Sequence, residues 1–207
     1  NVGCLGIVKK DNIVYGNALS TNSYLIYVGS KTGNEGINGA AMASKTFKDS
    51  CITQDLKDNV QKSDPFLEKL LLEACCEITE NKLAEGMQDM GAGGLLCASL
   101  EVIKRGREKT NTNIGCILNL EKVPTKYSME YHNILISESQ ERMLIVCNEE
   151  NINPICEIFK KWDLEHSVIG KTNDTGNYSI YYNNDFLYCK QMNSFNDFHD
   201  YSNLPGV

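Results

Sequence analysis

Short apolar runs alternate with amphipathic segments along most of this chain, and this alternation is the strongest constraint on its fold. The run 143–147 has the length of a buried strand, whereas residues 64–78 repeat their apolar side chains at the spacing of one helix face. Strands that alternate with helices along a chain pack in layers, with the helices laid against a sheet. We therefore predict an α/β fold rather than an all-α or all-β one.

Three helices are predicted from their start signals. Asp64 is a favoured N-cap residue, and Pro65 suits the first helical position because its nitrogen has no hydrogen to leave unpaired. A second helix follows the glycine turn at 91–94, and a third begins at residues 153–154. The polar stretch 104–113 is expected to form an exposed loop after the second helix.

Strands are predicted from the short apolar runs between the helices. They cover residues 4–8, 24–28, a run that ends at Asp89, 116–120, 143–147, 168–169, and a hairpin of 178–182 with 186–189. A short helical stretch precedes Ser137, and the periodicity stops at Met192.

Charge and hydropathy restrict the partners of this chain. Among its 207 residues, 20 Lys and Arg stand against 27 Asp and Glu, and the net charge of −7 disfavours a nucleic-acid partner. No apolar run approaches the roughly 20 residues that cross a bilayer, and no basic, apolar leader is present, so we expect a cytoplasmic location without a membrane partner. The chain begins at Asn1 rather than Met, and we expect it to be a piece of a longer polypeptide.

The nine cysteines are predicted to be buried free thiols. Their number is odd, they form no C-x-x-C pair, and most of them lie in apolar runs. Free cysteine packs as a small hydrophobe in a reducing cytosol. The three histidines lie near none of them in a catalytic pattern, so a thiol enzyme is not expected.

Three polar segments could bind a ligand, and each has a structural alternative. The glycine-rich stretch 29–39 could cradle a phosphate, but it matches neither the P-loop nor the dinucleotide fingerprint, which favours a tight structural loop. Asp89 lies between a strand and a glycine turn, where it could bind Mg²⁺ or cap a helix. Residues 137–142 could orient a polar ligand or form a solvated turn, and Gln61 has no independent signal.

Taken together, these segments resemble a known enzyme family. Ser137-Glu-Ser-Gln-Glu-Arg-Met143 and Gln88-Asp-Met-Gly-Ala-Gly-Gly94 closely resemble the large, or synthetase, subunit of phosphoribosylformylglycinamidine synthase. Segments 29–36, 64–70 and 158–170 match in the same order. The resemblance implies a role in purine biosynthesis, in which formylglycinamide ribonucleotide, ATP and ammonia give formylglycinamidine ribonucleotide, ADP and phosphate.

The resemblance also implies a fold and a set of site residues. The fold would be a mixed sheet layered with helices, like the C-terminal domain of aminoimidazole ribonucleotide synthase. Asp89 would be a Mg²⁺ ligand, Gln61 would contact the ribonucleotide, and Glu138, Ser139 and Gln140 would line its site.

The family's domain order implies that this chain is only part of an enzyme. Residues 1–28 would contain the end of the preceding ferredoxin-like domain and the entry strands, 29–191 the aminoimidazole ribonucleotide synthase-like domain, and 192–207 a linker. The family's catalytic histidine and most of its ATP ligands lie in the preceding domain. The chain is therefore expected to be inactive alone, with the other synthetase domains and a glutaminase subunit or domain as partners.

Several positions depart from the family pattern, and two alternatives stay open. Asn34-Glu35 stands where Arg-Asp is common, and Gly93 replaces a common Ala. One alternative is a scaffold or regulatory module that kept the fold without the site. The other is a relative such as aminoimidazole ribonucleotide synthase, selenophosphate synthetase or thiamine monophosphate kinase, against which the segment 137–143 argues.

Overall fold

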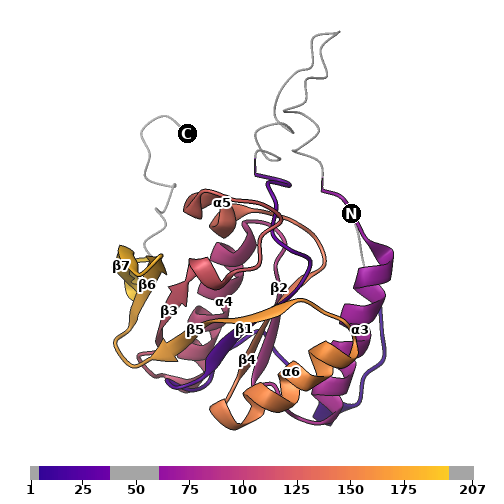
Figure 1. Cartoon of the computed structure of the whole chain (residues 1–207). Coiled ribbons are helices and arrows are strands. Elements are labelled where there is room, and N and C mark those ends of the chain that lie inside the picture. Colours follow the sequence, from indigo (N-terminus) through magenta and orange to yellow (C-terminus); the bar gives the residue numbers. More distant parts are fainter. Residues whose placement is uncertain (1–4, 38–60, 196–207) are drawn as a thin grey trace, which may run out of the picture.

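A seven-stranded mixed sheet forms the middle layer of the molecule (Figure 1). The computed structural model describes residues 5–37 and 61–195. The strands follow the order β2-β4-β1-β5-β3-β6-β7, in which β3 and β6 pair in parallel and the other neighbours are antiparallel. The predicted α/β fold with a mixed sheet is confirmed.

The elements follow the predicted alternation for most of the chain. The strands are β1 (Tyr24–Gly29), β2 (Gly86–Asp89), β3 (Gly115–Asn119), β4 (Arg142–Cys147), β5 (His166–Asn173), β6 (Asn177–Tyr182) and β7 (Asp185–Gln191). The α-helices are α3 (Pro65–Glu80), α4 (Gly94–Thr110), α5 (Tyr131–Ile136) and α6 (Ile152–Lys161). Short 3₁₀ turns are η1 (Lys10–Asn12), η2 (Leu120–Lys122), η3 (Glu149–Asn151) and η4 (Met192–Phe195).

Helices cover both faces of the sheet because its central strands are apolar on both sides. Along β1, Leu25 and Tyr27 belong to the core that includes residues of α4 and α5, whereas Ile26 and Val28 belong to the core with α3 and α6. Successive side chains of a strand point to opposite faces, so two separate cores form on one sheet. Figure 1 shows the same arrangement, with α3 and α6 together on one side.

Helix α3 begins where its sequence signal places it. The Asp64 carboxylate accepts hydrogen bonds from the amides of Phe66 at 3.1 Å and Leu67 at 3.0 Å, so it caps the helix as predicted. The helix then buries the side chains spaced along one face, Leu71, Ala74 and Ile78.

The strand predicted over residues 4–8 is not formed in the part that the structure describes. Residues 5–8 have no strand partner, the side chains of Leu5 and Ile7 are fully exposed, and Cys4 lies outside the described residues. A short apolar run forms a strand only when it pairs with another strand. Strand β2 lies at one edge of the described sheet and pairs only with β4, so residues 5–8 do not extend the sheet there.

The loop predicted over residues 104–113 is also wrong, because α4 continues to Thr110. Lysine, arginine and glutamate are good helix formers, and Arg105 pairs with Glu101 one turn earlier at 2.6 Å. Gly106 is buried against the backbone of Ala18, which ties this end of the helix to the rest of the molecule.

The chain leaves the sheet through η4, where Met192 is buried against the core. The remainder of the expected linker, 196–207, lies outside the described residues, as do 38 and 39 of the glycine-rich stretch. Among the helices of the described ranges, none combines the length and the apolar character needed to cross a membrane.

Candidate functional site

Strand pairing brings three separate loops together at one end of the sheet. Strand β1 ends at Gly29, which lies opposite Arg142 at the start of β4, and β2 ends at Asp89, which lies opposite Met143. The loop after β1, the turn between β2 and α4, and the loop before β4 therefore meet. These loops contain the segments that were predicted to bind a ligand.

Glu138 lies at the centre of this arrangement. Its carboxylate accepts a hydrogen bond from the amide of Gly93 at 3.1 Å, and its other oxygen accepts one from Gln61 Nε2 at 2.7 Å. Gly93 is the N-cap residue of α4, and its φ of 71° is in the left-handed region that suits glycine. Gln61 and Glu138, which are 77 residues apart, are thus brought into direct contact at a helix N-terminus.

Ser139 and Gln140 follow Glu138 in the same segment but differ in burial and in their hydrogen-bond partners. Ser139 is buried, and its hydroxyl accepts a hydrogen bond from the amide of Gly33 at 2.9 Å while donating to the Glu35 carboxylate. Gln140 is half-buried and donates from Nε2 to the Glu138 carbonyl oxygen at 2.9 Å. The hydroxyl of Ser139 is therefore engaged within the protein, whereas the Glu138 carboxylate contacts Gln61, an exposed residue.

Asp89 stands at the exposed end of β2, as predicted, and does not cap α4. The N-cap position belongs to Gly93, and Asp89 Oδ1 instead accepts a hydrogen bond from Gln88 Nε2 at 2.9 Å. Arg105 in turn donates to Gln88 Oε1 at 2.6 Å. Within the two described ranges, no group of three or more His, Cys, Asp or Glu side chains is placed to hold a metal ion. The exposed Asp89 carboxylate could supply one oxygen ligand to Mg²⁺, which takes oxygen ligands and keeps several waters.

Arg142 organises the site, although the sequence places it only among the polar residues of the segment 137–142. Its guanidinium is 2% exposed and donates to the carbonyl oxygens of Ser139 at 2.6 Å and Ser137 at 2.5 Å, and to Thr32 Oγ1 at 3.2 Å. Burial lowers the pKa of Arg142, although Tyr27 and the nearby carboxylates act in the opposite direction. The sequence signal for this role is that Arg142 is a charged residue at the first position of an otherwise apolar strand.

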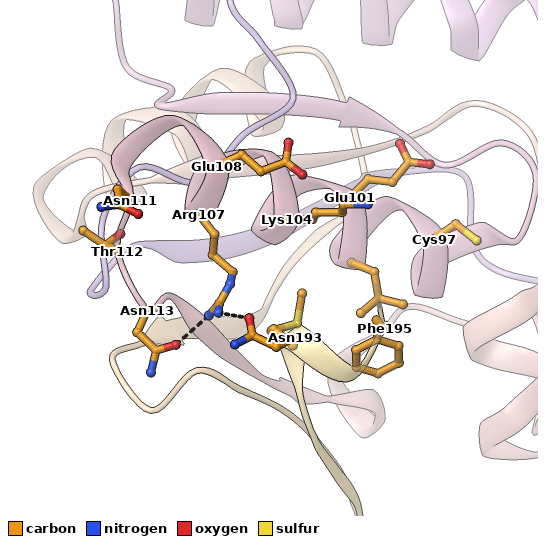
Figure 2. Close-up of a pocket in the computed structure, with 12 residues that line it drawn as sticks. Cys97, Glu101, Lys104, Arg107, Glu108, Asn111, Thr112, Asn113, Asn193 and Phe195 are labelled. Atoms are coloured by element: carbon orange, nitrogen blue, oxygen red, sulfur yellow. Dashed lines mark hydrogen bonds between the residues drawn. The ribbon is translucent and has the colours of Figure 1, made fainter. Parts of the chain in front are cut away.

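Two pockets lie near these elements, and only the larger one reaches the predicted site residues. It has a volume of about 890 Å³, and Asp89, Gly91 and Gln140 line it together with α3 and the N-terminal segment. A pocket of about 630 Å³ lies between α4 and η4 (Figure 2). There Arg107 donates to Asn113 Oδ1 at 2.9 Å and Asn193 Oδ1 at 2.6 Å, and none of the predicted site residues lines it.

Comparison with known proteins identifies the family. Residues 21–183 match the family described as "AIR synthase related protein, C-terminal domain", and the chain belongs to that family. It is similar to phosphoribosylformylglycinamidine synthase subunit PurL of Campylobacter curvus, with 42% identity over 188 residues, which are 90% of this chain and 25% of that protein. The subunit PurL of Pelagibacter ubique is 45% identical over 184 residues, 88% of this chain and 24% of that protein. The chain thus spans about a quarter of the length of these relatives.

Solved structures agree with this assignment. Thermotoga maritima PurL complexed with FGAR superposes with a TM-score of 0.78 and 36% identity, covering 90% of this chain and 30% of that one. The same protein complexed with ATP gives a TM-score of 0.74 and 33% identity, covering 90% and 27%. Thiamine-monophosphate kinase from Stenotrophomonas maltophilia, with a TM-score of 0.55 and 11% identity over 87% of this chain and 56% of that one, shares the fold alone. The resemblance to phosphoribosylformylglycinamidine synthase that the motifs indicated is confirmed.

Proposed function

We propose that this chain is the substrate-side domain of a phosphoribosylformylglycinamidine synthase that acts in purine biosynthesis. The reaction is the ATP-dependent amidation of formylglycinamide ribonucleotide to formylglycinamidine ribonucleotide. The observation that carries the proposal is the contact of Gln61 and Glu138 at the N-terminal end of α4, next to a pocket that Gln140 and Asp89 line together. The similarity to a PurL that was solved with FGAR supports it.

Each residue in this proposal has a role that suits its environment. Gln61, Glu138 and Gln140 bind the polar groups of the ribonucleotide, and Ser139 lines its site while its hydroxyl holds the loop after β1 against the loop before β4. Asp89 contributes one oxygen ligand to Mg²⁺. The ion, when bound, neutralises phosphate charge, which is the main need of phosphoryl chemistry. ATP is bound mainly by the preceding domain.

The proposal extends to the rest of the enzyme. Residues 1–28 contain the end of the preceding domain and the entry strand β1, which lies inside the sheet of the domain that follows. Residues 29–191 form the rest of the substrate-side domain, and 192–207 link it to the second half of the synthetase. The partners are the other synthetase domains and a glutaminase subunit or domain, in a cytoplasmic enzyme. This chain is similar to a chain in the solved structure of PurLQS from Thermotoga maritima, with 32% identity and a TM-score of 0.74. That similarity supports the proposed partners.

Titration calorimetry with formylglycinamide ribonucleotide tests the proposed site. The protein should include the preceding domain, because that domain completes the cleft. We expect binding that weakens about tenfold in Gln140→Ala, which removes a polar contact, and no change in Lys160→Met on the exposed face of α6. Absence of binding by the unaltered protein would favour the scaffold alternative.

A steady-state assay tests the claim that the isolated chain is incomplete. With ATP, ammonia and the ribonucleotide, the 207-residue chain should form no formylglycinamidine ribonucleotide. Measurable turnover by this chain would contradict that part of the proposal.

A further inference from the structure

The glycine-rich loop, residues 29–37, uses its backbone amides to bind other parts of the protein. Thr32 donates to the Pro124 carbonyl oxygen at 2.8 Å, and Asn34 donates to Tyr127 Oη at 2.9 Å. Gly33 donates to Ser139 Oγ at 2.9 Å. A phosphate cradle needs amides that point at the anion, and these three are already paired. The contacts therefore favour the structural alternative for this part of the loop.

Glu35 is the side chain through which this loop holds the loop before β4. Its Oε1 accepts a hydrogen bond from Lys126 Nζ at 2.5 Å, and its Oε2 accepts one from the Ser139 hydroxyl. Its backbone carbonyl oxygen accepts the amide of Glu138 at 2.8 Å. The Glu35 side chain is 13% exposed and Ser139 is buried, so the bond to Ser139 is shielded from water, whereas Lys126 is 38% exposed. Hydrogen bonds to a charged carboxylate are stronger than those between neutral groups.

The next residue fits the same arrangement. Gly36 has a φ of 78°, and a Cβ at this position would lie 2.5 Å from the Cβ of Glu138. Glycine thus allows the backbone after Glu35 to run directly against the Glu138 side chain. From there the Glu138 carboxylate reaches the amide of Gly93 and Gln61.

We propose that Glu35 is a positioning residue, which holds Glu138 and Ser139 in the geometry that the ribonucleotide site requires. This inference rests on the proposed function. Glu35 acts through the residues that it bonds and does not itself contact the ligand. Lys126, which pairs with the Glu35 carboxylate, is also joined to this loop through its backbone, because its amide donates to the Thr32 carbonyl oxygen at 2.9 Å. Burial alone would raise the pKa of Glu35, but its hydrogen bonds to Lys126 and Ser139 lower it below the ordinary value, so the carboxylate is charged near neutral pH.

Amide hydrogen exchange in the unliganded chain, followed residue by residue by NMR, tests this inference without relying on ligand binding. In Glu35→Ala, the amides of Gly33, Glu138 and Gly93 should exchange about tenfold faster, because Ser139 loses its acceptor and the segment loosens. The core amides of β1 and α6 should keep their rates. Glu157→Ala is the matched control, because it removes an exposed carboxylate that pairs with Lys160 at 2.7 Å.

Conservative variants separate positioning from general stability. Glu35→Asp keeps the charge with a shorter reach, and its site amides should exchange at rates between those of the unaltered chain and Glu35→Ala. If Glu35→Ala does not fold, Glu35→Gln removes the charge and leaves one acceptor oxygen for the two donors Lys126 and Ser139, so the site amides should again exchange faster than in the unaltered chain. Equal acceleration at site and core amides, or none at the site, would overturn the inference. A failure of ribonucleotide binding by the unaltered protein would instead contradict the proposed function and leave the exchange result standing.

Discussion

Buried polar side chains decide the local geometry at the candidate site. Within the described ranges, every buried side-chain nitrogen and oxygen has a hydrogen-bond partner. Arg142 shows why this matters, since its guanidinium bonds two carbonyl oxygens of the loop before β4 and the hydroxyl of Thr32. A buried charge is tolerated only when such partners are present. The shape of this loop therefore depends on one arginine.

We predict that Arg142→Met destabilises the protein by about 2–4 kcal/mol. The methionine fills part of the volume but leaves the carbonyl oxygens of Ser137 and Ser139 buried without donors. Urea unfolding followed by circular dichroism measures the change. Lys160→Met, on an exposed surface, should leave the midpoint where it is, and equal midpoints for the two variants would contradict the role given to Arg142.

At the level of elements, α4 shows how tertiary contacts extend a helix beyond its apolar stretch. Residues 104–110 are mostly polar, yet they are helical, because the buried face continues through Val102, Ile103 and Gly106. The charged side chains occupy the other face, where Arg105 pairs with Glu101. Composition alone predicted a loop here, whereas the spacing of the few small and apolar residues is helical.

Gly106→Ala tests this packing, and we predict a loss of about 1–3 kcal/mol. Alanine is favoured over glycine in an exposed helix, but a Cβ on Gly106 would overlap the carbonyl oxygen of Ala18, a backbone atom that cannot rotate away. Thermal unfolding measures the difference. Gly6→Ala is the control, since a Cβ there meets nothing within 4 Å. A variant at Gly106 that is more stable than the unaltered chain would show that the helix does not pack on Ala18.

Over the whole molecule, the cysteines differ in burial according to their position relative to the two cores. The seven described cysteines are free, as predicted, and Cys116 and Cys147 are buried, one in each core. Cys76 and Cys189 are exposed, so the prediction of burial is wrong for them. Cys4 and Cys51 lie outside the described residues. Burial raises the pKa of the Cys147 thiol to about 12 and also raises the pKa of the Cys116 thiol.

The rate of thiol labelling should follow the burial of each cysteine. With iodoacetamide at pH 8, Cys76 and Cys189 should react first, because they reach solvent and the thiolate is the reactive form. Cys116 and Cys147 should react only on unfolding, since they lack both access and thiolate. Peptide mass spectrometry at timed intervals measures the rates, with the urea-unfolded chain as control. Equal rates at the four sites in the folded chain would contradict the two-core description.

The elements were more predictable than the contacts at the site. The helix cap at Asp64, the glycine turn before α4 and the apolar strand β4 depend on neighbours within a few residues, and each was read correctly from the sequence. Glu35 lies within one of the family motifs, but its partners Lys126 and Ser139 are 91 and 104 residues away, and no local pattern identifies them. The prediction of a strand over residues 4–8 is wrong for the same reason, because a strand must pair with the edge of a sheet, and that edge is formed by residues far away in the sequence.

The class of fold, the order of most elements and the family are predictable from the sequence, because periodicity, caps and contiguous motifs are local properties of the chain. Which loops meet, which polar groups are buried and which residues hold the site together depend on how the folded chain is arranged. Pairing of β1 and β2 with β4 places the loop before β4 beside Glu35 and the turn before α4. Hydrogen bonds between such distant residues follow from the arrangement of strands in the sheet, and that arrangement is a property of the folded chain.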